Sequence, residues 1–122
     1  MLKIKLFAAA FAMCCISINA FAVEAYIGQF LYQYNSGNTY RVIAKDNEHM
    51  AWECIKGPEV GTKGLEKPQR YELNKHIYYV TWVEKTGVQV SQAVNFRQMK
   101  VYSTIIEGKN RYVLEGTIVR EK

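Results

Sequence analysis

The fold class follows from one stretch, residues 76–84, which reads His76-Ile77-Tyr78-Tyr79-Val80-Thr81-Trp82-Val83-Glu84. Its bulky side chains Tyr78, Val80 and Trp82 fall on every second position. Successive side chains of a β-strand point to opposite faces of the sheet, so this spacing predicts a strand with one buried face. A helix would repeat its apolar positions every three to four residues instead.

The same alternation extends in both directions along the chain. Apolar and aromatic residues lie at even-numbered positions in most of the runs, as in Phe30, Tyr32 and Tyr34. Turn-forming residues such as those at positions 35–38 separate the runs. The pattern predicts eight strands, at residues 26–34, 39–45, 49–56, 69–73, 76–84, 88–96, 99–106 and 111–119.

Eight antiparallel strands joined by short turns favour an all-β fold, an up-and-down barrel. Closing the sheet removes its open edges, and eight strands can enclose one small ligand. The glycines and prolines of residues 56–67 predict a loop, which would cover one end of the barrel as a lid. The same alternation also permits a flattened sandwich of two sheets.

The first 22 residues predict an export signal. Two lysines precede an apolar run over residues 6–16, and Ala20-Phe21-Ala22 supplies the small residues before a cleavage site. We therefore expect a signal peptide at residues 1–22 and one mature domain at residues 23–122, periplasmic or secreted. An uncleaved anchor and lipidation at Cys14 or Cys15 are the alternatives. No second apolar run of spanning length follows, so we expect no stable membrane insertion after cleavage.

Charge and composition exclude several classes of function. The chain of 122 residues has 16 basic and 11 acidic residues, a net charge of +5. Loss of residues 1–22 would remove two lysines and leave +3, and the basic residues are scattered, which argues against a nucleic-acid partner. His49, His76 and Cys54 lack the spacing of metal ligands. We therefore expect no nucleic-acid partner, no metal and no cofactor.

The predicted interior is rich in aromatic side chains. An aromatic wall with a few polar groups, here including Gln92, is typical of a small-molecule site. Aromatic packing, with the hydroxyl groups bonded to the backbone or to water, explains the pattern equally well. The inward-facing aromatic residues are Tyr32, Tyr34, Tyr40, Trp52, Tyr78, Trp82 and Tyr112. Of these we take Tyr40, Trp52, Tyr78 and Trp82, together with Gln92, as candidate ligand-binding residues.

Glu84 lies on the same strand face as Tyr78 and Trp82. Desolvation inside an apolar barrel would raise the pKa of its carboxyl group, which could then donate a proton near neutral pH. Alternatively, the strand ends at this residue and Glu84 points to water at the rim, near Lys85. Its position at the end of the run favours the second interpretation.

Several short motifs occur in a fixed order along the chain. They are Ile27-Gly28, Tyr32-Gln33-Tyr34, Gly37, Tyr40, the spacing of Gly57 and Gly61, and residues 78–87. In these motifs the chain resembles the bacterial phenolic acid decarboxylases over about residues 27–96. It also resembles the MoaF-like domain, over nearly the whole of residues 23–122 and with a similar length. Both families are lipocalin-like (calycin) barrels.

The decarboxylase resemblance implies roles for individual residues. Tyr32 and Tyr34 would hold the substrate carboxylate, and Tyr40 would lie in the same pocket. Glu84 would protonate the substrate double bond, giving a quinone methide that loses carbon dioxide. Glu84, Tyr32 and Tyr34 are therefore the candidate catalytic residues. The position that matches the decarboxylases' arginine holds Thr62, followed by Lys63.

Three hypotheses of function follow. The first is an exported barrel that binds a small aromatic or amphipathic ligand in its interior. The second is a cofactor-independent carboxy-lyase, which acts on a hydroxycinnamic-type acid with Glu84 as general acid. The third is a packed barrel that works through its outer surface, as an envelope protein-interaction or inhibitor module.

Overall fold

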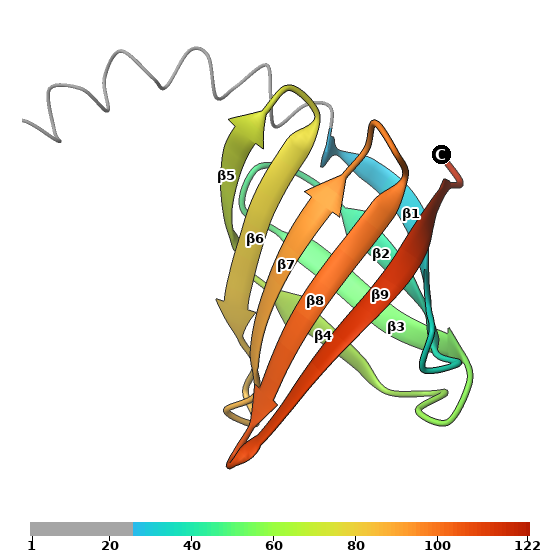
Figure 1. Ribbon diagram of the computed structural model, residues 1–122, viewed down its shortest axis with the longest axis vertical. Coiled ribbons are helices and arrows are strands. Elements are labelled where there is room, and N and C mark those ends of the chain that lie inside the picture. Colours follow the sequence, from blue (N-terminus) through green and yellow to red (C-terminus); the bar gives the residue numbers. More distant parts are fainter. Residues whose placement is uncertain (1–25) are drawn as a thin grey trace, which may run out of the picture.

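The computed structural model describes residues 26–122, which form one antiparallel β-sheet (Figure 1). The predicted signal peptide at residues 1–22 lies outside the described residues. Within residues 26–122 no helix is long and apolar enough to cross a membrane. The strands are β1 (Gly28–Tyr34), β2 (Thr39–Ala44), β3 (Met50–Lys56), β4 (Lys63–Glu66), β5 (Gln69–Asn74), β6 (Ile77–Val83), β7 (Gln89–Asn95), β8 (Lys100–Glu107) and β9 (Asn110–Arg120).

The strands follow one another in up-and-down order, and the sheet curls on itself. The spatial order is β4-β3-β2-β1-β9-β8-β7-β6-β5, so the first and last strands pair with each other. Figure 1 shows β1–β4 passing behind β6–β9. The prediction of an antiparallel all-β fold is confirmed. Two details were wrong: the described residues form nine strands rather than eight, and they form a curled half-barrel rather than a fully closed barrel, because β4 and β5 do not pair.

The additional strand, β4, lies where glycines and prolines predict only a loop. Gly64 stands opposite Trp52 on β3. A Cβ atom at Gly64 would lie 2.7 Å from Nε1 of Trp52. Glycine in a strand often marks such a close approach. Glycine at position 64 disfavours a strand by composition, but its lack of a side chain leaves room for the Trp52 indole beside β4.

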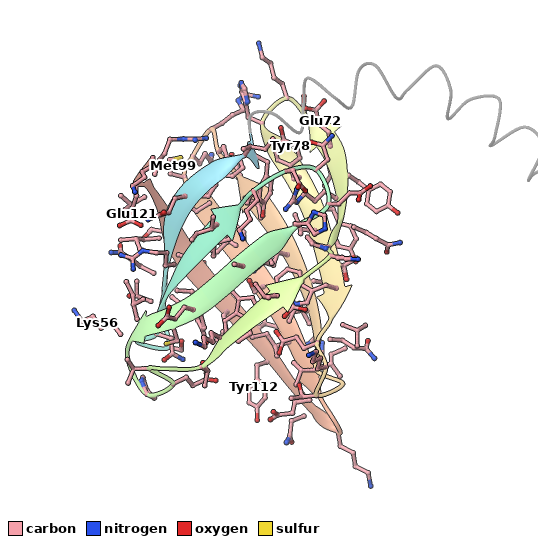
Figure 2. All side chains as sticks on the ribbon, turned by 180° about the vertical axis from the view of Figure 1, so that it is seen from behind. Lys56, Glu72, Tyr78, Met99, Tyr112 and Glu121 are labelled. Carbon is pink, nitrogen blue, oxygen red and sulfur yellow. The ribbon has the colours of Figure 1, made fainter. Side chains whose placement is uncertain are left out.

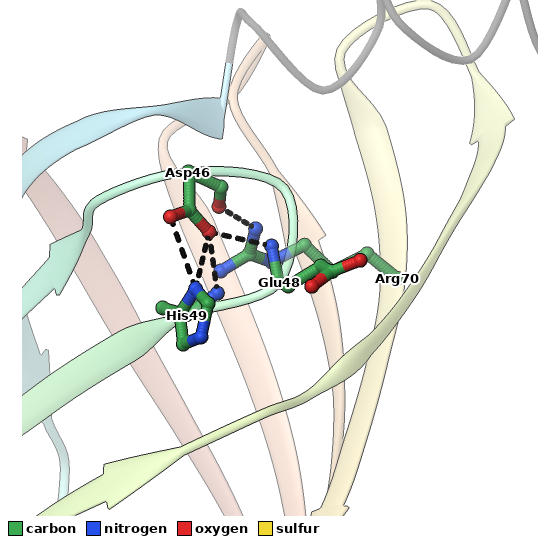
Figure 3. A network of polar contacts seen from close by, with 4 residues as sticks. All are labelled: Asp46, Glu48, His49 and Arg70. Carbon is green, nitrogen blue, oxygen red and sulfur yellow. Dashed lines mark hydrogen bonds and ion pairs between the residues drawn. The ribbon is translucent and has the colours of Figure 1, made fainter.

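A side chain of β5 reaches across the open seam to the turn between β2 and β3. Nη1 of Arg70 donates a hydrogen bond to the backbone oxygen of Asp46 over 2.6 Å (Figure 3). The Asp46 carboxylate accepts hydrogen bonds from the backbone N–H groups of Glu48 and His49, at 2.8 Å each, and lies 2.8 Å from Nδ1 of His49. These bonds fix the turn and lower the pKa of Asp46.

One end of the half-barrel is closed by an aromatic cluster, which we call the closed end. Tyr26 lies at its centre, and its ring makes edge-to-face contacts with Phe30, Tyr78 and Phe96, at centroid distances of 6.2, 5.3 and 5.1 Å. Tyr26, Phe30 and Tyr78 are almost completely buried. Edge-to-face pairs at such distances stabilise an aromatic core.

The predicted inward face is found on β1, β6 and β7, but β8 buries its odd-numbered residues. Val101 and Ser103 are buried, whereas Tyr102 is exposed. In the antiparallel pairing of β7 with β8, Gln92 stands opposite Ser103. The turn between these strands spans residues 96–99, and its last residue, Met99, has a φ of +55°, in the left-handed region.

 This four-residue turn shifts the alternation by one position between β7 and β8. The odd-numbered side chains of β8 therefore join the even-numbered ones of β7 inside the half-barrel.

Candidate ligand-binding site

The end of the half-barrel away from the closed end holds a cavity of about 390 Å³. Figure 2 labels Tyr78 and Tyr112 at opposite ends of the molecule, and only Tyr112 lines the cavity. The cavity is of a size that accepts a small organic molecule. Its wall contains nearly all of the inward-facing residues that the sequence predicts: Tyr32, Tyr34, Tyr40, Trp52, Trp82, Glu84, Gln92 and Tyr112.

Tyr78 is the candidate ligand-binding residue that the structure places elsewhere. Its side chain is 1% exposed and packs against Tyr26 and Phe96 at the closed end. It has the predicted inward direction, but it lies too far along β6 to reach the cavity wall. The alternation predicts which face a residue occupies, not its height in the barrel, and this explains the difference.

The floor of the cavity is a hydrogen-bonded group formed by Tyr34, Gln92 and Ser103. The hydroxyl oxygens of Tyr34 and Ser103 are 2.7 Å apart, and Nε2 of Gln92 donates to both over 3.1 Å. Burial raises the pKa of Tyr34, so its hydroxyl stays protonated at neutral pH. The Gln92 side-chain oxygen, Oε1, is buried and has no hydrogen-bond partner among the described residues.

Glu84 follows directly after β6 and lines the cavity. It is half-buried, and Nε1 of Trp82 donates a hydrogen bond to its Oε2 over 3.3 Å. Desolvation raises the pKa of Glu84, and the nearby carboxylates of Glu66, Glu59 and Glu107 raise it further. Glu84 therefore stands at the end of the strand and lines the cavity.

The turn after β3 contributes a second carboxylate, Glu59. Its Oε2 accepts hydrogen bonds from Nδ2 of Asn38, over 2.9 Å, and from the hydroxyl of Tyr40, over 3.2 Å. Oδ1 of Asn38 accepts a hydrogen bond from the backbone N–H of Glu59 over 3.0 Å. Burial, followed by the Glu59 charge, raises the pKa of Tyr40. Part of the predicted lid therefore forms the edge of the cavity, and this part is held by Asn38.

Sequence reasoning missed several further lining residues, including four with polar side chains. Ser103 and Glu107 lie on β8, whose alternation is shifted, and Asn38 and Glu59 lie in turns, where no alternation exists. To predict that Gln92 pairs with Ser103, one would need the register between β7 and β8, and the sequence does not determine this register. Within residues 26–122 no group of three or more His, Cys, Asp and Glu side chains has an arrangement that could hold a metal ion.

The curled antiparallel sheet and its interior cavity define the class of protein, a lipocalin-type β-barrel. Residues 28–119 match the model of the MoaF-like family, and the chain belongs to this family. The resemblance to the MoaF-like domain is thereby confirmed.

Comparison with solved structures supports the same fold. A similar structure is that of a Burkholderia vietnamiensis protein with a provisional beta-lactamase designation, which has a TM-score of 0.73 and 18% sequence identity. The match covers 77% of this chain and 92% of that one. At this identity the similarity shows the fold alone. No curated protein sequence matches the chain.

Proposed function

We propose that the protein is an exported MoaF-like barrel that binds a small aromatic or amphipathic ligand in its interior. The observation that carries this proposal is the cavity of about 390 Å³. A barrel that served only as a scaffold would fill this space with side chains, because protein interiors are normally close-packed. Export is proposed from the sequence of residues 1–22.

The wall of the cavity suits an aromatic or amphipathic guest. Tyr40 and Trp52 face each other edge to face at a centroid distance of 5.8 Å, and Trp82 lies on the wall as well. These rings offer apolar contact area, while the floor of Tyr34, Gln92 and Ser103 offers hydrogen bonds. Apolar walls with a few placed polar groups fix both the affinity and the orientation of a ligand.

We expect a side chain that fills the cavity to block binding. Leu114 on β9 is half-buried and lines the cavity, so Leu114→Trp places an indole in the space that a ligand needs. The affinity for the neutral aromatic dye N-phenyl-1-naphthylamine should fall by about tenfold or more. The measurement is the fluorescence of the dye during titration with protein.

The matched control for this experiment is Val113→Trp. Val113 is the preceding residue of β9, is 59% exposed and lies on the outer face. This variant adds the same side chain to the same strand and should keep the affinity of the unchanged protein. Equal loss of binding in both variants, or no dye binding by the unchanged protein, would contradict the proposal.

A second candidate function is the carboxy-lyase, and the environment of Glu84 favours it. Glu84 lines the same cavity as Tyr32 and Tyr34, and burial raises the pKa of its carboxyl group, as a proton donor requires. The position of the decarboxylases' arginine, however, holds Thr62, which is exposed and bonds to the backbone oxygen of Glu59. A hydroxyl group does not replace a bidentate guanidinium, so we rank this function second.

If the protein is such a lyase, the purified mature chain should release carbon dioxide from p-coumaric acid. Glu84→Gln should then abolish the release, because the amide has no proton to give to the double bond. Turnover by the Gln variant would remove Glu84 from the mechanism. No turnover by the unchanged protein, combined with dye binding, would favour the binding function over the lyase.

The third hypothesis, a module that works through its outer surface, has weaker support. Several large apolar side chains are exposed on the two edge strands, including Leu65 on β4 and Leu73 on β5, at 79% and 64%. That hypothesis assumes an interior filled with side chains, however, and the presence of the cavity is evidence against this assumption.

A further inference from the structure

The cavity wall carries charge of one sign. Within residues 26–122, the charged side chains that line the cavity are Glu59, Glu84 and Glu107, and all three are acidic. The chain as a whole has the opposite balance, with a net charge of +5. A basic protein with an acidic cavity has its negative charge concentrated where a ligand would enter.

These carboxylates lack a positive partner in the described part of the chain. The ion pairs found there join Arg41 to Glu121, His49 to Asp46 and Lys100 to Glu115, all away from the cavity. The groups that bond to Glu59 and Glu84 are the neutral side chains of Asn38, Tyr40 and Trp82. The carboxylates therefore repel one another, and a cation placed among them would relieve this repulsion.

The aromatic rings beside the carboxylates suit the same kind of ligand. Tyr40, Trp52, Trp82 and Tyr112 line the cavity together with the three glutamates. The face of an aromatic ring attracts a cation, most strongly for Trp, and rings grouped around a site are a common means of binding ammonium groups. Carboxylates and ring faces in one cavity thus favour a positively charged ligand over an anion.

A separate observation at the floor favours a ligand with a hydrogen-bond donor over one that has acceptors alone. Gln92 is 7% exposed and lines the cavity, and its Oε1 has no partner in residues 26–122. A buried acceptor without a donor is unfavourable, so such a group commonly marks a place where another molecule binds. An N–H or O–H group of a ligand would satisfy it, whereas a carboxylate has no proton to offer.

We propose that the ligand is an organic cation, an amine with an aromatic or apolar body. Its ammonium group lies among Glu59, Glu84 and Glu107, and its body lies against Trp52 and Trp82. This inference rests on the proposed binding function and names the chemical class of the ligand. It also opposes the lyase, because the substrate of that reaction is an acid whose charge the three glutamates would repel.

Three probes with one body test the sign of the charge. The ammonium ion of 3-phenylpropylamine, the neutral 3-phenylpropanol and the anion 3-phenylpropanoate share a phenyl ring on a three-carbon chain and differ in the polar end. By isothermal titration calorimetry at neutral pH and low salt, we expect the cation to bind about tenfold more tightly than the alcohol, and the anion to bind most weakly. The preference should shrink as salt is added.

Two variants and one control locate the selectivity. Glu84→Gln and Glu107→Gln should each weaken binding of the cation several-fold and change binding of the alcohol much less. Glu115→Gln removes the same charge from the outer face of β9, where Glu115 pairs with Lys100, and should change neither affinity. Because Glu107 is exposed at the end of β8, its variant keeps the test valid if Glu84→Gln does not fold.

The outcomes separate this inference from the function on which it rests. If the alcohol binds and the cation binds no better, or if the anion binds best, the ligand is not a cation but the cavity still binds ligands. If none of the three probes binds, the proposed function fails and this inference fails with it. If Glu84→Gln and Glu115→Gln weakened binding of the cation equally, the preference would come from the net charge of the protein, and the proposed cation site would be wrong.

Discussion

Replacing Tyr26 with alanine is expected to lower the free energy of unfolding by about 3–5 kcal/mol. Tyr26 is completely buried at the closed end, and its ring contacts those of Phe30, Tyr78 and Phe96. Alanine would leave a cavity that the surrounding rings fill only in part. The measurement is equilibrium unfolding in urea, followed by tryptophan fluorescence.

The loss has a second cause, which concerns charge. The guanidinium of Arg70 lies 4.8 Å from the centre of the Tyr26 ring, and its Nε and Nη2 are buried without a partner among the described residues. The ring therefore provides part of the environment that holds this cation. Desolvation lowers the pKa of Arg70, because burial disfavours the charged form of the guanidinium.

The matched control is Tyr26→Phe. This variant keeps the ring and removes only the hydroxyl, whose oxygen lies 3.1 Å from that of Tyr32. The expected loss is about 1 kcal/mol, the usual net value of one hydrogen bond. If Tyr26→Ala were no more destabilising than Tyr26→Phe, the ring would not be closing this end of the core.

Replacing Gly57 with alanine should destabilise the protein by about 2–4 kcal/mol. The φ of Gly57 is +108°, which side chains disfavour, and a Cβ atom would collide with the backbone oxygen of Gly37 and come within 2.7 Å of Cα of Asn38. Because Asn38 holds Glu59 at the edge of the cavity, we also expect weaker binding of ligands. Urea unfolding and dye titration measure the two effects.

Gly61→Ala separates the two reasons for this loss. Gly61 lies in the same turn with a φ of +97°, but no atom lies within 4 Å of the Cβ position. It shares the backbone strain without the collision, so a loss of about 1–2 kcal/mol is expected. Equal losses in the two variants would mean that the contact between Gly57 and the β1–β2 turn is unimportant.

The alternation of side chains was enough to predict much of the cavity wall. Tyr32, Tyr34, Tyr40, Trp52, Trp82 and Gln92 all lie where the pattern places them, because the period of a strand fixes which face each residue occupies. At β4, in contrast, the glycine-rich composition led to the wrong prediction of a loop. Gly64 is present because of a contact with Trp52, and a contact between strands cannot be read from composition.

Features that depend on the register of distant strands stayed beyond prediction. The inward direction of Ser103 follows from its pairing with Gln92, and the seam follows from the missing pairing between β4 and β5. The height of Tyr78 in the barrel likewise depends on how β6 pairs with its neighbours. None of these pairings changes the alternation within a strand, so they cannot be predicted from the sequence of one strand alone.

The pairing of β1 with β9 has a mechanical consequence. The two strands are antiparallel, and Phe30 pairs with Arg120, so the beginning of β1 and the end of β9 lie together. Tension applied between Ile27 and Lys122 would therefore load the hydrogen-bonded pairs of this ladder one after another instead of all at once. Such peeling needs little force, and the molecule should yield first where its first and last strands meet.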